Sequence, residues 1–143
     1  MADDKIEERY VLGEQIGFLL RKANQRHTEI FSKVMPEDMT PTRFAAMVKL
    51  YEFGHVSQNE LGRMTAMDVA TIKGVVDRLK TRNLVQSTKD SDDARRQLVS
   101  LTPRGEELIQ GFIPLATDIT AQTTDALTAK EAKTLQTLLM KIS

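Results

Sequence analysis

The chain has 143 residues, with 20 basic and 20 acidic side chains and no cysteine. This length suits one compact domain with its own core, and the absence of cysteine excludes disulfides, thiolate metal sites and thiol-based peroxide sensing. No run of 18 apolar residues is present and residues 1–10 are too polar for a signal peptide, so we expect a cytoplasmic protein without a membrane span.

The N-terminal region has the apolar spacing of a long helix over residues 6–34. Its apolar residues occupy more than one face, and a helix of this length spans roughly 42 Å, which is more than a small lobe needs. We therefore expect a partner subunit to cover it. A second helix is predicted over residues 41–53, with Thr40 as its cap, Pro41 as its first residue and Gly54 at its end.

Residues 57–102 have the order helix, turn, helix, strand, loop, strand. Ser57 and Glu60 have the spacing of a capping box, which predicts the start of the first helix. Asp68 predicts the cap of a second helix over residues 69–82. The apolar positions expected to bury one face of that helix are Val69, Ile72, Val75, Val76 and Leu79.

Two strands, over residues 84–89 and 97–101, are predicted on either side of a polar loop. Together with the two preceding helices they make the pattern of a winged helix-turn-helix. Residues 57–105 carry nine basic and six acidic side chains, a net charge of +3, whereas the rest of the chain is slightly acidic. This distribution favours binding of the phosphate backbone of duplex DNA by the central region.

The C-terminal region, residues 103–143, is predicted to be helical. Pro103 follows a threonine in a cap-plus-proline start, and Pro114 is expected to kink or interrupt this helix. Thr128 and Glu131 predict a second capping box at the start of the last helix. Apolar faces at both ends of the chain favour burial against a two-fold mate.

The sequence DDARRQLVSLTPRG carries a D-x-R followed by L-T-x-x-G, which fall on Asp93, Arg95, Leu101, Thr102 and Gly105. It resembles the wing of the MarR family of bacterial transcriptional regulators, and the similarity extends through nearly the whole chain. The resemblance implies a single mainly α domain over residues 1–143 with a small β-wing, forming an obligate homodimer. Residues 6–34 and 103–143 would be its dimerisation helices and residues 41–102 its DNA-binding lobe.

The second helix of the winged helix-turn-helix is expected in the major groove, where Thr71 and Lys73 would contact base edges. The resemblance implies that Arg95 enters the minor groove and that Asp93 orients it. The alternatives are a solvated helix face for Lys73 and, for Arg95, a salt bridge that only stabilises the wing. The expected DNA contacts are Ser57, Gln58, Thr71, Lys73, Lys80, Arg82, Lys89, Asp93, Arg95 and Arg96.

Cationic side chains lie beside aromatic and aliphatic ones in the first helix, which suits binding of an aromatic carboxylate or a larger CoA thioester. The segment LLRKANQRHTEIF also resembles MarR relatives that control the catabolism of aromatic acids. The alternative role is helix packing for His27 and a solvated face for Arg21 and Arg26. The expected effector residues are Phe18, Arg21, Arg26, His27, Phe31, Met47 and Tyr51.

These observations predict a repressor of aromatic-compound catabolism genes that leaves a pseudo-palindromic DNA operator when a small ligand binds. We expect no enzyme activity, cofactor or metal, because two histidines without cysteine give neither a nucleophile with its base nor a tetrahedral metal site. Two alternatives stay open: a DNA-binding regulator without an effector, and a winged helix used as a protein-interaction module.

Overall fold

The computed structural model describes residues 9–36 and 38–143. Its first long helix, α1, covers Ile16–Val34 and follows a short 3-10 helix, η1, at Leu12–Glu14. In the described part of the chain, no helix is long and apolar enough to cross a membrane.

The helix predicted over residues 6–34 is wrong at its start. The backbone of Gln15 is extended, and α1 begins only at the next residue. Gly13 lowers the helix propensity of the preceding segment, and Tyr10, which belongs to the apolar pattern, is exposed. Helical spacing without a surface to bury against does not stabilise a helix in water. Ile6, where the predicted helix begins, lies outside the described residues.

The lobe predicted to bind DNA contains three helices: α2 (Pro41–Phe53), α3 (Gln58–Met64) and α4 (Val69–Thr81). Each begins at its predicted cap. Thr40, Ser57 and Asp68 accept hydrogen bonds from main-chain amides three residues later, at 3.3, 3.3 and 2.7 Å. Gly54 ends α2 with a positive φ of 80°, as expected for a helix C-terminus.

The predicted strands are confirmed as β2 (Val85–Lys89) and β3 (Gln97–Leu101). A third strand that the sequence did not predict, β1 (Val56–Ser57), pairs with β3, so that the antiparallel order is β1-β3-β2. Val99 stands opposite both Val56 and Ser87. The short strand β1 therefore ties the start of the helix-turn-helix to the wing.

The core of the lobe lies between its three helices and the sheet. Its most deeply buried side chains include Met47, Leu61, Ile72, Val76, Leu79 and Ile109. Four of the five apolar positions predicted to be buried in α4 are buried, but Val69 is 70% exposed. Val69 is the first residue of α4. It lies outside the core, which the later turns of the helix cover.

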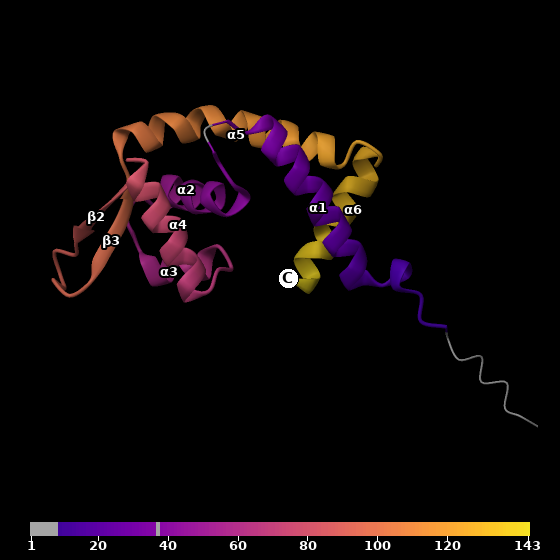
Figure 1. The fold of residues 1–143 in the computed structure, drawn as a ribbon, viewed down its shortest axis with the longest axis horizontal. Helices are drawn as coiled ribbons and strands as arrows, with labels where there is room; N and C mark the ends of the chain where they lie inside the picture. Colours follow the sequence, from indigo (N-terminus) through magenta and orange to yellow (C-terminus); the bar gives the residue numbers. More distant parts are fainter. Residues whose placement is uncertain (1–8, 37) are drawn as a thin grey trace, which may run out of the picture.

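The helix α5 (Pro103–Thr123) arches over the lobe and links it to the terminal helix α6 (Ala129–Ile142) (Figure 1). The α5 helix continues through Pro114, so the predicted interruption does not occur. Thr128 and Glu131 form the predicted capping box at the start of α6.

Thr102 joins the wing to α5. Its hydroxyl accepts a hydrogen bond from the amide of Gly105 at 3.0 Å and donates one to the carbonyl of Asn83 at 2.7 Å. A Cβ atom at position 105 would lie 2.0 Å from the carbonyl oxygen of Leu84, so only glycine fits there. These contacts give a physical reason for the threonine and glycine of the L-T-x-x-G motif.

The helices α1 and α6 lie side by side at the end of the molecule away from the lobe (Figure 1). An apolar cleft between them is lined by Ile16, Leu19, Leu20, Ala23, Leu135, Leu138, Leu139 and Ile142. Most of these side chains are exposed in the single chain. This end of the molecule therefore presents an apolar face that its own chain does not cover.

Candidate DNA-binding surface and effector cavity

The first turn of α4 presents the residues predicted for the major groove. Thr71 is exposed, and hydrogen bonds from its side chain and amide lower the pKa of Asp68, which therefore stays ionised as the helix cap. The Lys73 ammonium lies 2.7 Å from the Asp77 carboxylate one turn later, with most of its side chain in solvent. Val69 adds an exposed apolar group to the same turn, as contact with a thymine methyl requires.

The wing tip holds its arginine as expected. The Asp93 carboxylate accepts hydrogen bonds from the main-chain amide of Arg95 at 3.0 Å and from its Nε at 3.2 Å. These two bonds, together with the nearby charge of Arg96, hold the pKa of Asp93 below its ordinary value. The Arg95 side chain is 93% exposed. It is thus oriented by Asp93 while its terminal nitrogens project into solvent.

An open groove separates the start of α3 from the wing. It brings together five of the predicted DNA contacts with three residues that sequence reasoning missed: Ser57, Gln58, Asn59, Arg63, Asp93, Arg95, Arg96 and Gln97. Arg63 pairs with the Glu60 carboxylate, which consequently does not complete the predicted capping box with Ser57. The i, i+4 spacing of Asn59 and Arg63 was the available signal, since it places both on one helix face.

The three remaining predicted contacts do not line this groove. Lys80 and Lys89 are exposed near the ends of α4 and β2. Arg82 has a side chain only 23% exposed, and its Nη1 lies 3.5 Å from Asp38. It therefore contacts the segment before α2.

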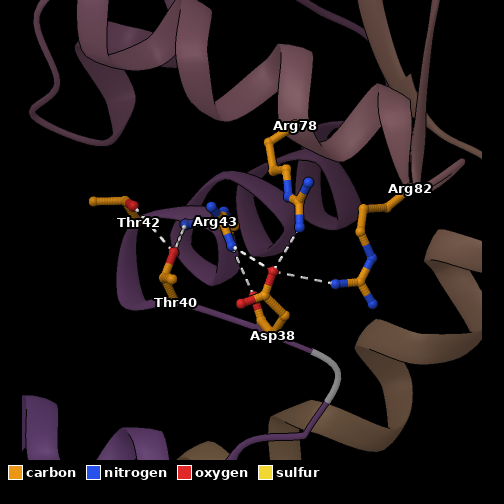
Figure 2. Close-up of polar contacts among 6 residues, drawn as sticks. All are labelled: Asp38, Thr40, Thr42, Arg43, Arg78 and Arg82. Atoms are coloured by element: carbon orange, nitrogen blue, oxygen red, sulfur yellow. Dashed lines mark hydrogen bonds and ion pairs between the residues drawn. The ribbon is translucent and has the colours of Figure 1, made fainter.

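Asp38 is the centre of an ion-pair cluster, the Asp38 clasp, formed by Asp38, Arg43, Arg78 and Arg82 (Figure 2). Its carboxylate lies 2.8 Å from Arg78 and 3.3 Å from Arg43. The hydrogen bond from Arg78, with the charges of Arg43 and Arg82, lowers the pKa of Asp38. Arg78 lies in α4 and Arg82 directly follows it. The clasp therefore connects the segment between α1 and α2 to α4. The sequence shows only that the two arginines share a helix face.

A cavity of about 170 Å³ lies where α1, α2 and α5 meet. It is lined by His27, Phe31, Pro41, Phe44, Ala116, Ile119 and Thr120. The rings of Phe31 and Phe44 pack edge to face with centroids 6.0 Å apart. Nδ1 of His27 lies 2.9 Å from the hydroxyl of Thr123. Thus the structure brings His27 and Phe31 together and adds Phe44 from α2.

The other five predicted effector residues lie away from this cavity. Arg26 bonds to the carbonyls of Gln122 and Thr123 and to Asp125, so it caps the C-terminus of α5. Met47 is buried in the lobe core. Phe18 is half-buried below the Lys22 ammonium. Arg21 and Tyr51 are exposed, and the Tyr51 hydroxyl lies 3.5 Å from the side-chain nitrogen of Gln110. Over residues 9–36 and 38–143, no group of three or more metal-ligating side chains is placed to hold a metal ion.

Comparison with known proteins identifies the family. The MarR family model matches residues 39–96. The chain is 42% identical over 134 residues to the HTH-type transcriptional repressor NicR of Pseudomonas putida, covering 93% of this chain and 85% of NicR.

Two solved structures relate this fold to DNA and ligand binding. One is BpsR of Bordetella bronchiseptica, whose DNA binding is regulated by 6-hydroxynicotinic acid: TM-score 0.88, 38% identity, covering 93% of this chain and 96% of BpsR. The other is a mutant of Escherichia coli MarR complexed with operator DNA: TM-score 0.82, 26% identity, covering 89% and 92%. The resemblance inferred from the wing motif is confirmed: this chain belongs to the MarR family and is a DNA-binding transcriptional repressor.

Proposed function

We propose that the protein is a cytoplasmic homodimeric repressor that a small aromatic carboxylate, of the hydroxynicotinate type, releases from a pseudo-palindromic operator. The observation that carries this proposal is the position of the His27 cavity. Its walls come from α1 and α5 on one side and from the first turn of α2 on the other. A ligand bound there touches both the terminal helices and the DNA-binding lobe.

The dimer is supported by the apolar face at α1 and α6. A two-fold mate is the commonest means of covering such a face in a homo-oligomer. Two recognition helices related by that axis would read half-sites about 10 bp apart, one turn of duplex. In each subunit, the first turn of α4 and the groove between α3 and the wing would face the DNA.

The chemistry of the cavity favours a small aromatic ligand. Phe31 and Phe44 give it aromatic walls, and His27 and Thr120 give it polar groups at fixed positions. Its volume of about 170 Å³ is below the ~300 Å³ at which pockets for drug-sized ligands begin. A CoA thioester, the larger of the two predicted ligand classes, is therefore disfavoured. The similarity to BpsR supports a hydroxylated pyridine carboxylate.

The Asp38 clasp offers a route from the cavity to the DNA. Pro41 and Phe44 line the cavity from the start of α2, and Asp38 precedes this turn by three residues. Displacement of this turn by a ligand would alter the ion pairs that hold α4 through Arg78. The ligand acts by favouring dimers whose recognition helices no longer match the operator. A ~100-fold loss of operator affinity requires about 2.7 kcal/mol of coupling.

The test is a fluorescence-anisotropy titration on the promoter region that flanks the gene, at two salt concentrations, with and without 6-hydroxynicotinic acid. We expect tight, salt-sensitive binding that survives competitor DNA and is weakened by the acid, but less by its uncharged amide. Specific binding that the acid leaves unchanged would indicate a regulator without this effector class. Weak binding with no preference over competitor DNA would mean that the operator lies outside this promoter region.

A further inference from the structure

His27 takes part in a hydrogen-bond chain that determines which of its nitrogens carries hydrogen. The Thr123 hydroxyl lies 2.9 Å from Nδ1 of His27 and donates its hydrogen to the carbonyl of Ile119 at 2.8 Å. A hydroxyl has one hydrogen to donate and otherwise accepts. Both contacts are hydrogen bonds together only when Nδ1 donates to the Thr123 hydroxyl and the hydroxyl donates to the carbonyl. The chain of contacts therefore favours the Nδ1–H tautomer of the neutral imidazole, in which Nε2 is bare.

The bare Nε2 remains accessible. Among the described residues Nε2 makes no hydrogen bond. In the described residues that are not exposed, the only fully buried side-chain polar atom without a partner is Ser100 Oγ, so Nε2 is not fully buried. His27 is half-buried and lines the cavity, and its unbonded nitrogen retains accessible surface. A ligand entering the cavity meets an imidazole whose other edge is already fixed to α5.

Among the described residues, His27 is the only titratable side chain that lines the cavity. The residues that α2 contributes are Pro41 and Phe44, and those from α5 are Ala116, Ile119 and Thr120. The charged groups adjacent to His27 are Arg26 on its own helix and Asp125 after α5. These two pair with each other at 3.3 Å, and Arg26 also bonds to the carbonyls at the end of α5. Within the described chain, a carboxylate in the cavity therefore has only His27 as its counter-ion.

We propose that His27 takes up one proton at Nε2 when an aromatic carboxylate binds, so that effector recognition is linked to pH. This inference rests on the proposed effector site. The proton comes from solvent, and the resulting imidazolium donates to Thr123 through Nδ1 and to the ligand carboxylate through Nε2. An imidazole is the side chain that can exchange a proton with solvent in the physiological pH range.

The sign of the pH dependence follows from this linkage. The bound state favours protonated His27, so binding is tightest at low pH, where the free protein already carries the proton. It weakens as pH rises, because the proton must then be taken from solvent. A single linked proton weakens binding by at most about ten-fold per pH unit.

The test is isothermal titration calorimetry of the full-length protein with 6-hydroxynicotinic acid from pH 6.5 to 8.5, in phosphate and in Tris. We expect the apparent enthalpy to differ between the buffers by an amount that corresponds to nearly one proton taken up at the alkaline end. The dissociation constant should rise by about ten-fold per pH unit there. Binding without proton uptake would overturn the proposal and leave the proposed function standing, whereas absence of binding would overturn both.

Two histidine variants identify the group. His27→Asn keeps an N–H donor near the position of Nδ1 but has no titratable nitrogen, and should bind with a pH-independent affinity at least ten-fold weaker at pH 6.5. His55→Asn removes the one other histidine, which is exposed in the lobe, and should retain the proton uptake of the wild type. Uptake that persists in His27→Asn would refute the assignment to His27.

A measurement without ligand or variant tests the tautomer itself. The nitrogen-15 shifts of the His27 ring in the free protein at pH 8 should show hydrogen on Nδ1 and a bare Nε2. A ring with hydrogen mainly on Nε2 would contradict the proposal, because the neutral ring could then donate to the ligand carboxylate through Nε2 without taking up a proton.

Discussion

The DNA-binding lobe buries its apolar side chains within one chain, whereas the terminal helices leave theirs exposed. In α4, Leu79 is 1% exposed, but Leu138 in α6 is 54% exposed. The helices and strands of one chain therefore cover the core of the lobe, and in the proposed dimer a second copy would cover the terminal end. The proposed effector cavity lies at the boundary between these two regions, where a small ligand can change how they sit against each other.

The largest expected effect comes from disrupting the apolar face that α1 and α6 form at the terminal end. Leu138→Asp places a charge on the uncovered apolar face, so we expect the dimer to dissociate while the lobe keeps its fold. Operator affinity should fall by ~10²–10⁴-fold, because the DNA-binding lobes of the two subunits no longer bind as one molecule. Analytical ultracentrifugation and anisotropy measure the two quantities, with circular dichroism as the check on folding.

Phe53→Asp is the matched control, since Phe53 is also exposed and apolar but lies on the lobe. It should remain dimeric. A Leu138→Asp protein that sediments as a dimer with wild-type operator affinity would show that this face of α6 is not the dimer interface.

The next largest effect should come from the wing. Arg95→Ala removes the exposed guanidinium that Asp93 orients, and should lower operator affinity by more than ten-fold with the dimer intact. Arg95→Lys keeps the charge but lacks the Nε bond to Asp93, so it should recover only part of the loss. Arg104→Ala, which removes the same charge from the start of α5, serves as the control. Equal operator affinities of the Arg95→Ala and Arg104→Ala proteins would indicate that Asp93 and Arg95 only stabilise the wing.

The sequence predicted the parts of both regions that depend on local contacts. Each cap involves residues three positions apart, which is why Thr40, Ser57, Asp68 and Thr128 were all recognised. The wing motif was recognised for a similar reason, since its aspartate and arginine are two residues apart. A pattern of this range is visible in the chain without knowledge of its fold.

What the sequence did not predict depends on contacts between distant residues. The strand β1 is only two residues long, and exists because Val56 meets Val99. Asp38 meets Arg78 across 40 positions, and Arg26 meets Thr123 across 97. The sequence therefore did not show that Arg26 caps the C-terminus of α5. Which residues line the cavity similarly depends on how α1, α2 and α5 meet. Of the expected effector residues, only His27 and Phe31 line it.

The connection between the two regions should respond to Asp38→Asn. Asparagine tolerates the positive φ of 59° at this position but removes the charge that holds Arg43, Arg78 and Arg82. Without ligand, we expect operator affinity within about three-fold of the wild type. The weakening caused by 6-hydroxynicotinic acid should shrink by about five-fold, the lower end of allosteric coupling factors.

Asp118→Asn is the matched control for Asp38→Asn, because it removes one acidic charge from α5 outside the clasp. Anisotropy with and without ligand gives the coupling for each protein. An unchanged ligand effect in Asp38→Asn would leave the clasp as a purely structural contact between α4 and the segment before α2.

The smallest effect concerns acid stability, which the lobe should dominate. Among the described residues, lowered carboxyl pKa values occur at three lobe residues (Asp68, Asp77 and Asp93), at Asp38 just before the lobe, and at one residue of the terminal helices, Glu131. A carboxyl with a lowered folded-state pKa stabilises the fold above its ordinary value, 3.8 for Asp68, and this stabilisation is lost as pH falls through the folded-state pKa.

Asp68→Asn separates the charge from the cap, because the amide oxygen still accepts the bond from the Thr71 amide. We expect the variant to have a slightly lower urea midpoint than the wild type at pH 7. The difference should disappear as pH falls from about 5 to about 2, where the wild-type carboxyl becomes protonated. Asp92→Asn removes the same charge from the wing loop, where it caps no helix in the described chain, and should show no such convergence. Because a dimer unfolds at a midpoint that depends on its concentration, all three proteins must be compared at one concentration. A gap between wild type and Asp68→Asn that stays constant over this range would mean that the charge at the start of α4 does not stabilise the recognition helix.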